Sequence, residues 1–313
     1  MVSGARPPAD VTFSVVIPAY NAARTISSAI TSALGQTAGD LEVIIVDDGS
    51  TDGTADVAAA IPDSRVRIVS QPNRGLPAAR NAGIAEARGR HISLLDSDDL
   101  LLPRYLDLSR QALERTPSPG FAYTDAYVFD AATGRVRERS AMSRSNPPIP
   151  APEDPGEFLA AMLRCNFVYV STTIPRQVLR AVGGFDEHRT SSEDYELWLR
   201  ILLAGYRAAW VPGRQALYRK HPGQMSKNLT TMAKSLAAVY DDLPAEAMPS
   251  EAHRRLLAQR RRSAHLQARY FAPVAGVIPP ALLAMVKRTG LGDSWHETLP
   301  AEVADAYPDL TAV

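Results

Sequence analysis

Three aspartates within four positions, Asp96, Asp98 and Asp99, are the residues best suited to chemistry in this chain. They follow the largely apolar run 92–95, which suits a buried strand of a parallel sheet. Carboxylates this close repel one another unless a cation or hydrogen-bond donors compensate them. The spacing therefore predicts a divalent metal site, but a solvated turn that caps a helix uses the same residue types. This peptide alone leaves both interpretations open.

An alternation of strands and helices is predicted to position these aspartates. Apolar and β-branched runs at 13–17, 41–46, 66–69 and 92–95 predict four strands. Segments with helical spacing or helix-start residues lie between them, at about 26–34, 53–60 and 76–88. This order predicts an α/β fold with a Rossmann-like, mostly parallel central sheet flanked by helices.

Polar loops follow three of the predicted strands at the point where each strand ends. These loops are residues 18–21, 47–52 and 96–99. Open α/β sheets bind their ligands at the carboxyl ends of the strands, so the three loops are expected to meet in one crevice.

Composition excludes several classes of protein. The 313 residues include 34 Lys and Arg and 34 Asp and Glu, so no net charge favours nucleic acid as a partner. Cys165 is the single cysteine, which excludes an intrachain disulfide and a cysteine-rich metal site. Its apolar neighbours favour a buried filler rather than a nucleophile.

Neither end of the sequence predicts a membrane span. Residues 1–10 are small and polar, without a secretory signal, and we interpret them as a disordered N-terminus. The apolar tract at 274–286 is too short to cross a bilayer and contains Pro279 and Pro280. We expect a cytoplasmic protein and leave peripheral membrane contact open.

After residue 102 the regular alternation ends. The sequence predicts a helix at 105–115, a strand at 121–129, a proline-rich loop or lid at 135–155, a helix at 156–164 and a strand at 167–173. A turn at 183–187, a helix from about 192, strands at 206–211 and 216–219, and an arginine- and alanine-rich helical tail complete the chain.

Seven motifs in register resemble those of inverting family 2 glycosyltransferases. They are residues 18–21, 46–52, 73–81, 95–99, 183–187, 193–194 and 218–226, and the resemblance covers residues 11–228. It implies a glycosyltransferase A-type fold, a nucleotide-diphosphate sugar donor, a Mn²⁺ or Mg²⁺ ion and direct displacement at the anomeric carbon. The implied parts are a nucleotide-sugar-binding half at 11–102, an acceptor-binding and catalytic half at 103–228 and a helical C-terminal extension at 229–313.

The resemblance assigns the metal and the diphosphate to the acidic loop. Asp98 is the expected direct ligand, with Asp96 toward the ribose or the metal and Ser97 beside the donor. Asp99 is either a further ligand or a helix cap. His221 resembles the family's late histidine near the metal or the diphosphate, although a histidine before proline is also typical of a surface.

The same resemblance places the nucleotide against the earlier loops. Pro18, Tyr20 and Asn21 correspond to contacts with the base and ribose, and Asp48 to the acceptor of a uracil or thymine imide hydrogen bond. Tyr20 could instead be a packing residue. Arg80 could offset the diphosphate charge, or it could form a salt bridge on a helix surface.

Glu193 and Asp194 match the acidic pair whose second member is taken as the catalytic base. The acceptor hydroxyl must lose a proton as it attacks, so a positioned carboxylate is required. We assign this role to Asp194, with Glu193 orienting the loop or the acceptor. The alternative is that both acids stabilise a helix N-terminus. Trp198 either lines the acceptor pocket or packs in the core.

The predicted reaction moves a hexose-type sugar from a UDP or dTDP donor to a glycan, lipid-linked or small-molecule acceptor. One rival is a nucleotidyltransferase, although no glycine-rich phosphate loop with a following lysine lies near Pro18. A second rival is a non-catalytic sugar-nucleotide-binding module. The basic stretch 254–262 favours a helix packed on the catalytic part, with an anionic membrane or a homodimer contact as alternatives.

Overall fold

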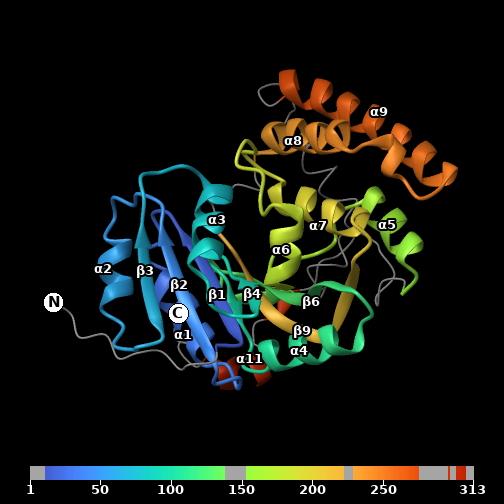
Figure 1. Ribbon diagram of the computed structural model, residues 1–313. Helices are drawn as coiled ribbons and strands as arrows, with labels where there is room; N and C mark the ends of the chain where they lie inside the picture. The colour runs from blue at the N-terminus through green and yellow to red at the C-terminus, as the bar shows by residue number, and fades with distance from the viewer. Residues whose placement is uncertain (1–10, 138–152, 222–227, 275–294, 297–300, 308–313) are drawn as a thin grey trace.

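The computed structural model describes residues 11–137, 153–221, 228–274, 295–296 and 301–307. The predictions for residues 1–10, for most of the loop at 135–155 and for the apolar tract beyond residue 274 therefore fall outside the described residues. Figure 1 shows a curled central sheet with helices on both faces, which confirms the predicted α/β class.

The N-terminal half of the sheet consists of four parallel strands in the order β3-β2-β1-β4. The strands are β1 (Phe13–Ala19), β2 (Leu41–Asp47), β3 (Val66–Ser70) and β4 (His91–Leu94), with α1 (Ile26–Leu34), α2 (Thr54–Ala59) and α3 (Leu76–Glu86) between them. Pro18 of β1 lies opposite Val46 of β2, so these two strands end at the same level. The strands and helices predicted for this half are confirmed, with small shifts at their ends.

Strands β1 and β2 are buried along their whole length, and alternate residues face two separate cores. Val16 and Ile44 share a core with Ala79 of α3. Val15 and Ile45 lie in a second core, which includes the buried face of α1. Burial on both faces explains why these strands are continuous apolar runs rather than alternating ones.

The rest of the sheet is mixed. Its strands are β5 (Leu100–Leu101), β6 (Pro119–Asp130), β7 (Arg135–Arg137), β8 (Thr172–Pro175), β9 (Arg207–Lys220) and β10 (Trp295–His296). Strand β8 runs antiparallel to β4 on one side and to β6 on the other, while β9 is parallel to β6 and antiparallel to β5. The helices α4 (Tyr105–Arg115), α5 (Pro155–Arg164), α6 (Arg176–Val182) and α7 (Glu193–Leu203) belong to this half. Parallel pairing is thus confined to the first four strands and the β6–β9 pair.

Two strand predictions in this half differ from the structure. The two strands predicted at 206–211 and 216–219 are one strand, β9, which continues through Pro212 and Gly213 with a register irregularity opposite β6. Such an irregularity accommodates a proline and a glycine with positive φ inside a strand. In the sequence, the same two residue types are typical of a turn, so the pattern predicts two strands instead of one. The predicted strand at 167–173 begins only at Thr172, and its earlier residues line the cleft described below.

Two helices of the C-terminal part pack together over α5 and α7 (Figure 1). They are α8 (Leu229–Asp242) and α9 (Glu251–Val274), joined through the short 3-10 helix at Ala245–Ala247. Arg261 of α9 donates to the carbonyl oxygens of Tyr240 and Leu243. The predicted helical C-terminal part is therefore confirmed for the described residues, as a helix pair that contacts α5. No helix within the described ranges is long and apolar enough to cross a membrane.

The last described segment returns to the opposite side of the molecule. The helix α11 (Ala301–Ala306) buries Val303 against Leu100 and Leu102, the residues that follow the three aspartates. The hydroxyl of Tyr307 donates to the carbonyl oxygen of Leu101. This packing beneath the acidic loop is not visible in the sequence, because Val303 lies about two hundred residues from the strand it covers.

Gly89 permits a close approach between the end of α3 and β1, and replacing it is expected to destabilise the fold. A Cβ on Gly89 would lie 2.6 Å from the backbone nitrogen of Ser14, and backbone cannot move aside as a flexible side chain can. We expect Gly89→Ala to lower the free energy of unfolding by about 1–3 kcal/mol in urea titrations. Gly39→Ala is the matched control, since a Cβ there meets nothing within 4 Å. Equal stability of the two variants would contradict this account.

Candidate functional site

A cleft of about 1410 Å³ lies at the carboxyl ends of β1, β2 and β4. Residues of all three predicted loops line it, among them Tyr20, Asp48 and Asp96. Glu193 and Asp194 line the same cleft, although they come from α7, about one hundred residues later. Chain topology therefore gathers the two acidic motifs that the sequence shows separately.

Asp48 organises one wall of the cleft. Its carboxylate is buried and accepts hydrogen bonds from the side chain of Gln71 at 2.7 Å and from the backbone nitrogens of Arg74 and Gly75 at 2.9 Å each. These bonds hold the loop that enters α3. Asp48 also lines the cleft, and an ionised carboxylate has about four acceptor positions, so one position is left for a ligand donor.

Pro18, Tyr20 and Asn21 lie at the same wall. Tyr20 is 53% exposed, which is unusual for a large side chain, and it lines the cleft. Asn21 has a φ of 51°, and its side-chain oxygen accepts a hydrogen bond from the backbone nitrogen of Thr51 at 2.9 Å. Asn21 thus joins the loops after β1 and β2. Direct contact of these three residues with a nucleotide stays a prediction.

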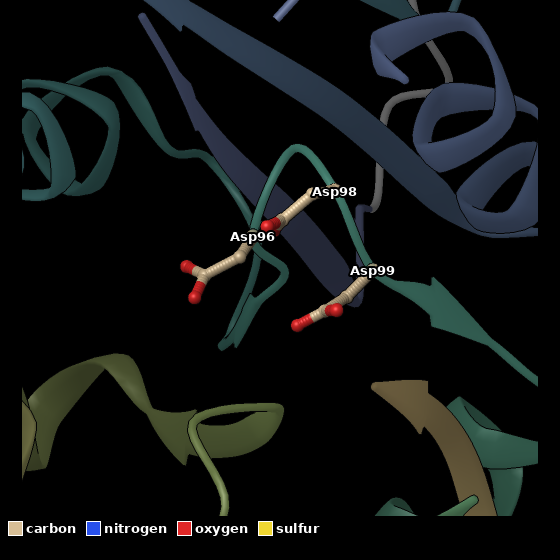
Figure 2. A group of neighbouring side chains, drawn as sticks. All are labelled: Asp96, Asp98 and Asp99. Atoms are coloured by element: carbon tan, nitrogen blue, oxygen red, sulfur yellow. The ribbon is translucent and has the colours of Figure 1, made fainter. Parts of the chain in front are cut away.

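The side chains of the three aspartates project from a single turn between β4 and β5 (Figure 2). One carboxylate oxygen from each of Asp96, Asp98 and Asp99 lies within 4.8 Å of the others. The imidazole Nε2 of His221 lies 2.8 Å from a carboxylate oxygen of Asp98. Ser97, between them, also lines the cleft. A cluster of carboxylate oxygens with one imidazole is a suitable donor set for Mg²⁺ or Mn²⁺.

The aspartates differ in how their oxygens are used. Each oxygen of Asp99 accepts one hydrogen bond, from the hydroxyl of Tyr169 at one and from the backbone nitrogen of Arg219 at 2.8 Å at the other. Asp99 is also almost fully buried, so it fixes the turn between β4 and β5. Asp98 is partly exposed and faces the cleft. The geometry favours Asp98 as the ligand and Asp99 as the residue that positions it.

Burial and mutual repulsion disfavour the charged form of these acids. Burial, followed by the neighbouring charge of Asp96, raises the pKa of Asp98, and His221 opposes this effect. Burial raises the pKa of Asp99 well above its usual range, with Asp98 and Asp96 adding to the shift. A bound cation would remove this repulsion, so the residues present fit a divalent metal.

Arg80 connects the acidic loop to the second acidic motif. Its guanidinium is almost fully buried and lies 2.8 Å from Asp96 and 2.5 Å from Glu193. The predicted diphosphate contact of Arg80 therefore competes with two carboxylates that already hold it. The Nε of Arg80 has no hydrogen-bond partner among the described residues.

Asp194 lies in the first turn of α7, where Ser192 precedes the helix with a φ of 58°. One of its carboxylate oxygens accepts a hydrogen bond from the backbone nitrogen of Tyr195 at 2.6 Å. Burial raises the pKa of Asp194 to about 7, the charge of Glu193 acts in the same direction and Arg80 opposes both. A carboxylate with this pKa is well matched to accept a proton near neutral pH.

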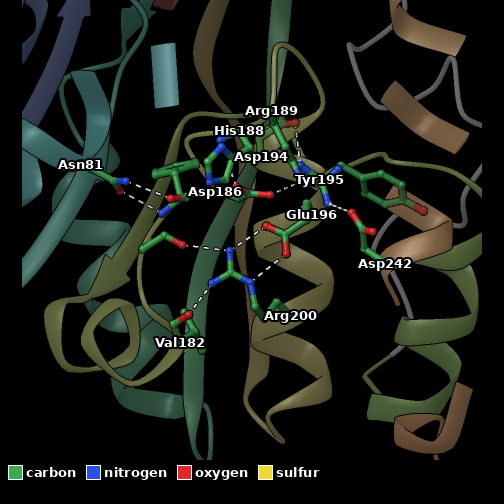
Figure 3. Close-up of polar contacts among 12 residues, drawn as sticks. Asn81, Val182, Asp186, His188, Arg189, Asp194, Tyr195, Glu196, Arg200 and Asp242 are labelled. Atoms are coloured by element: carbon green, nitrogen blue, oxygen red, sulfur yellow. Dashed lines mark hydrogen bonds and ion pairs between the residues drawn. The ribbon is translucent and has the colours of Figure 1, made fainter. Parts of the chain in front are cut away.

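The loop before Asp194 is held by side chains from two helices (Figure 3). Asn81 of α3 bonds both the nitrogen and the carbonyl oxygen of Phe185, each at 2.9 Å. Arg200 of α7 donates to the carbonyl oxygens of Val182 and Gly184 and forms an ion pair with Glu196. The glycine pair before Phe185 signalled the turn, but nothing in the sequence pointed to Arg200 or to Tyr169. Trp198 is fully buried, which confirms the core alternative for this residue.

Removal of the Arg80 charge is expected to destabilise the protein strongly. Arg80→Met would leave Asp96 and Glu193 without their cation in a buried setting, and we expect a loss of about 3–5 kcal/mol in the free energy of unfolding. Arg74→Met is the matched control, because Arg74 is exposed and pairs with Glu187 at 2.8 Å. Exposed pairs contribute at most about 1 kcal/mol. Similar urea midpoints for the two variants would show that the Arg80 bridge has no special weight.

Comparison with known proteins agrees with the fold. The model of glycosyl transferase family 2 matches residues 14–159, and that of glycosyl transferase family group 2 matches residues 91–288. The chain is 34% identical over 302 residues to the succinoglycan biosynthesis protein ExoO of Rhizobium meliloti, covering 93% of this chain and 84% of the relative. It is 32% identical to the Escherichia coli enzyme WfaP, a UDP-Glc:alpha-D-GlcNAc-diphosphoundecaprenol beta-1,3-glucosyltransferase, over 69% of this chain and 80% of the relative.

Two solved structures share the fold. TarS residues 1–349 of S. aureus, solved in complex with UDP-GlcNAc, superposes with a TM-score of 0.61 at 16% identity, covering 96% of this chain and 83% of the other. The mannosyltransferase PcManGT of Pyrobaculum calidifontis, solved with GDP-Man and Mn²⁺, gives a TM-score of 0.58 at 22% identity, covering 91% and 82%.

Proposed function

The chain belongs to the family 2 glycosyltransferases, with the glycosyltransferase A-type fold, and we propose that it transfers a sugar from a nucleotide diphosphate to an acceptor hydroxyl with inversion. Glycosyl transfer follows from the family. The donor class, the metal dependence and the residue roles are our proposal. The observation that carries it is the meeting, in one cleft, of a carboxylate cluster with a separate carboxylate whose pKa is about 7.

The residues of the cleft would divide the work between donor and acceptor. Asp48 and Tyr20 would hold the base, and Asp98, with Asp96 and His221, would hold the divalent cation. Such a cation, when bound, offsets the negative charge that develops on the leaving nucleoside diphosphate. Asp194 would take the proton from the acceptor hydroxyl. The hydroxyl oxygen would attack the anomeric carbon as the bond from that carbon to the diphosphate breaks. The configuration at that carbon would therefore invert.

Glu193 and Arg80 would position the base rather than contact the substrate. Arg80 pairs with Asp96 on the donor side and with Glu193 next to the base, so it fixes the separation between the two acidic motifs. Positioning of reacting groups is worth several powers of ten in rate when it is precise. Glu193 is buried against Arg80, which fits an orienting role.

UDP is the nucleotide that we propose first. WfaP is named for UDP-Glc, TarS was solved with UDP-GlcNAc, and an imide-reading carboxylate at Asp48 suits uracil or thymine. PcManGT was solved with GDP-Man, so a guanine nucleotide sugar is included among the donors to be tested. Names of relatives also support a glycan or lipid-linked acceptor, since ExoO is a succinoglycan biosynthesis protein and WfaP acts on a lipid diphosphate-linked sugar.

The proposal is tested with a panel of sugar nucleotides, with and without Mn²⁺. A ligand that binds only the native state raises its melting temperature, so the preferred donor should give the largest, Mn²⁺-dependent increase. Turnover with that donor should release a nucleoside diphosphate. The NMR coupling constant of the product's anomeric proton should show that the configuration at the anomeric carbon is inverted. Release of pyrophosphate would instead support a nucleotidyltransferase. Donor binding without turnover, unchanged in Asp194→Asn, would support a non-catalytic binding module.

A further inference from the structure

The same cleft has a further region, here called the second lobe, whose lining residues have no role in the donor binding proposed above. Its walls are the end of α5, the residues that follow it, and the facing sides of α8 and α9. Met232 and Leu236, one turn apart on α8, and Val168 supply apolar surface, while Arg164 and Arg260 supply charge. The C-terminal helix pair thus forms part of the site.

Arg260 is held in place without a carboxylate partner. Its guanidinium carbon lies 5.8 Å from the ring centre of Tyr240, and its Nε donates to the Tyr240 hydroxyl at 3.5 Å. On the same helix, Arg254 and Arg255 pair with Glu251, and Arg261 donates to carbonyl oxygens. Among the residues that the structure describes, no acid pairs with Arg260 or with Arg164.

Tyr195 and Tyr240 connect this arginine to the proposed base. Tyr195 follows Asp194 directly, its ring centre lies 6.1 Å from that of Tyr240, and Arg260 covers the far ring. The Tyr240 hydroxyl donates to the carbonyl oxygen of Leu163, the neighbour of Arg164. Arg260 therefore packs on Tyr240, and Arg164 follows the residue that Tyr240 bonds, so both arginines are anchored next to a ring that packs on Tyr195.

We propose that this lobe binds an acceptor whose sugar is linked to a diphosphate, with Arg164 and Arg260 holding the diphosphate and the α8 face holding an attached apolar chain. Guanidinium groups suit phosphate oxygens in both shape and charge. A pair of arginines is therefore better matched by a diphosphate ligand than by a ligand with a single carboxylate. The sugar hydroxyl would then reach Asp194 while the diphosphate stays at the opposite end. This inference rests on the proposed function.

The test measures acceptor binding by calorimetry at saturating UDP and Mn²⁺, so that the donor site and its metal are already occupied. Three probes carry the same N-acetylglucosamine: one on farnesyl diphosphate, one on methyl diphosphate and one as a farnesyl glycoside without phosphate. We expect the first probe to bind at least about tenfold more tightly than the third. The difference between the first and second probes separates a lipid-linked diphosphate from a soluble one, and equal affinity of those two would remove the apolar part of the proposal.

Variants then assign the residues. Arg164→Gln and Arg260→Gln are each expected to weaken binding of the farnesyl diphosphate probe about tenfold and to leave UDP affinity unchanged. Arg260→Lys keeps the charge and should recover part of the loss, which separates charge from packing on Tyr240. Arg262→Gln, on the same helix but not in the cleft wall, is the control.

Two results would overturn the assignment: equal affinity for the first and third probes, or an Arg262→Gln loss as large as that of Arg260→Gln. Absence of binding by every nucleoside diphosphate of the donor panel would instead count against the proposed function, and a preference for GDP would replace UDP by GDP in the acceptor test.

Discussion

Asp194→Asn is expected to lower kcat by about 10²–10⁴-fold while leaving the affinity for the nucleotide donor unchanged. The amide keeps the size of the side chain, and its oxygen can still accept the hydrogen bond from the backbone nitrogen of Tyr195. It cannot take a proton from the acceptor hydroxyl. Initial rates of nucleoside diphosphate release give kcat, and calorimetry with UDP and Mn²⁺ gives donor affinity.

The same substitution is not expected to destabilise the protein. Because the pKa of Asp194 is raised in the fold, the folded state binds more protons than the unfolded state between about pH 4 and 7. The carboxylate therefore disfavours folding as the pH rises through that window. Asp194→Asn removes this effect, so its melting temperature at pH 8 should equal or exceed that of the wild type. Asp186→Asn is the control and should retain activity, because Asp186 is partly exposed and does not line the cleft.

The pH dependence of kcat/KM follows from the same carboxylate. The base must be ionised to act, so kcat/KM is expected to rise about tenfold per pH unit below pH 7 and to level off above it. Burial of Asp194 is the main cause of this raised pKa, the charge of Glu193 raises it further, and Arg80 lowers it. A profile that stays flat from pH 5.5 to 8 in the wild type would remove Asp194 from this role.

Local sequence patterns were sufficient to predict the first half of the fold. Strands such as Phe13–Ala19 are buried on both faces, so their apolar runs identify them directly, and the polar loops after them mark the cleft. The second half was harder, because β9 carries Pro212 and Gly213 within one strand. Proline and glycine usually mark a turn, but here they accommodate an irregular pairing with β6. Which strands pair with each other cannot be read from local patterns in a single sequence.

The site was predictable as far as residue types reveal roles. The acids at 96–99 and 193–194 were found, and the structure brings both into one cleft. The contacts between them were not found, because a pairing such as Arg80 with Glu193 spans 113 positions and leaves no periodic signal. The sequence left Arg80 as either a phosphate ligand or a surface salt bridge, and the structure shows it buried and paired with two carboxylates. The sequence motifs used for the prediction end before α8 and α9. That these helices line the cleft is therefore evident only from the folded structure.

Asp98→Asn is expected to abolish the Mn²⁺-dependent part of donor binding and to lower kcat by about 10²–10³-fold. Asp98 faces the cleft and shares its carboxylate with His221, so its charge is the one most directly available to a cation. Mn²⁺ affinity is measured from the free-ion signal in electron paramagnetic resonance, which does not depend on turnover. Removal of metal with EDTA should lower wild-type activity to a similar degree, and added Mn²⁺ should restore it only in the wild type.

Stability separates a ligand from a structural residue in this cluster. The pKa of Asp98 is raised, so its charge disfavours the metal-free fold near pH 7, and Asp98→Asn should be at least as stable as the wild type without metal. Asp99→Ala should behave in the opposite way. It leaves the hydroxyl of Tyr169 and the backbone nitrogen of Arg219 without their acceptor, at a cost of about 1–3 kcal/mol for a buried group.

A reversed pattern, in which Asp98→Asn unfolds more easily and Asp99→Ala alone loses Mn²⁺, would exchange the two roles. Asp99 would then be the ligand, and Tyr169 and Arg219 would serve to orient it. In the expected pattern, Asp98 with Asp96 would hold the cation. Arg80, which pairs with Asp96 and Glu193, ties this acidic loop to the helix that carries Asp194.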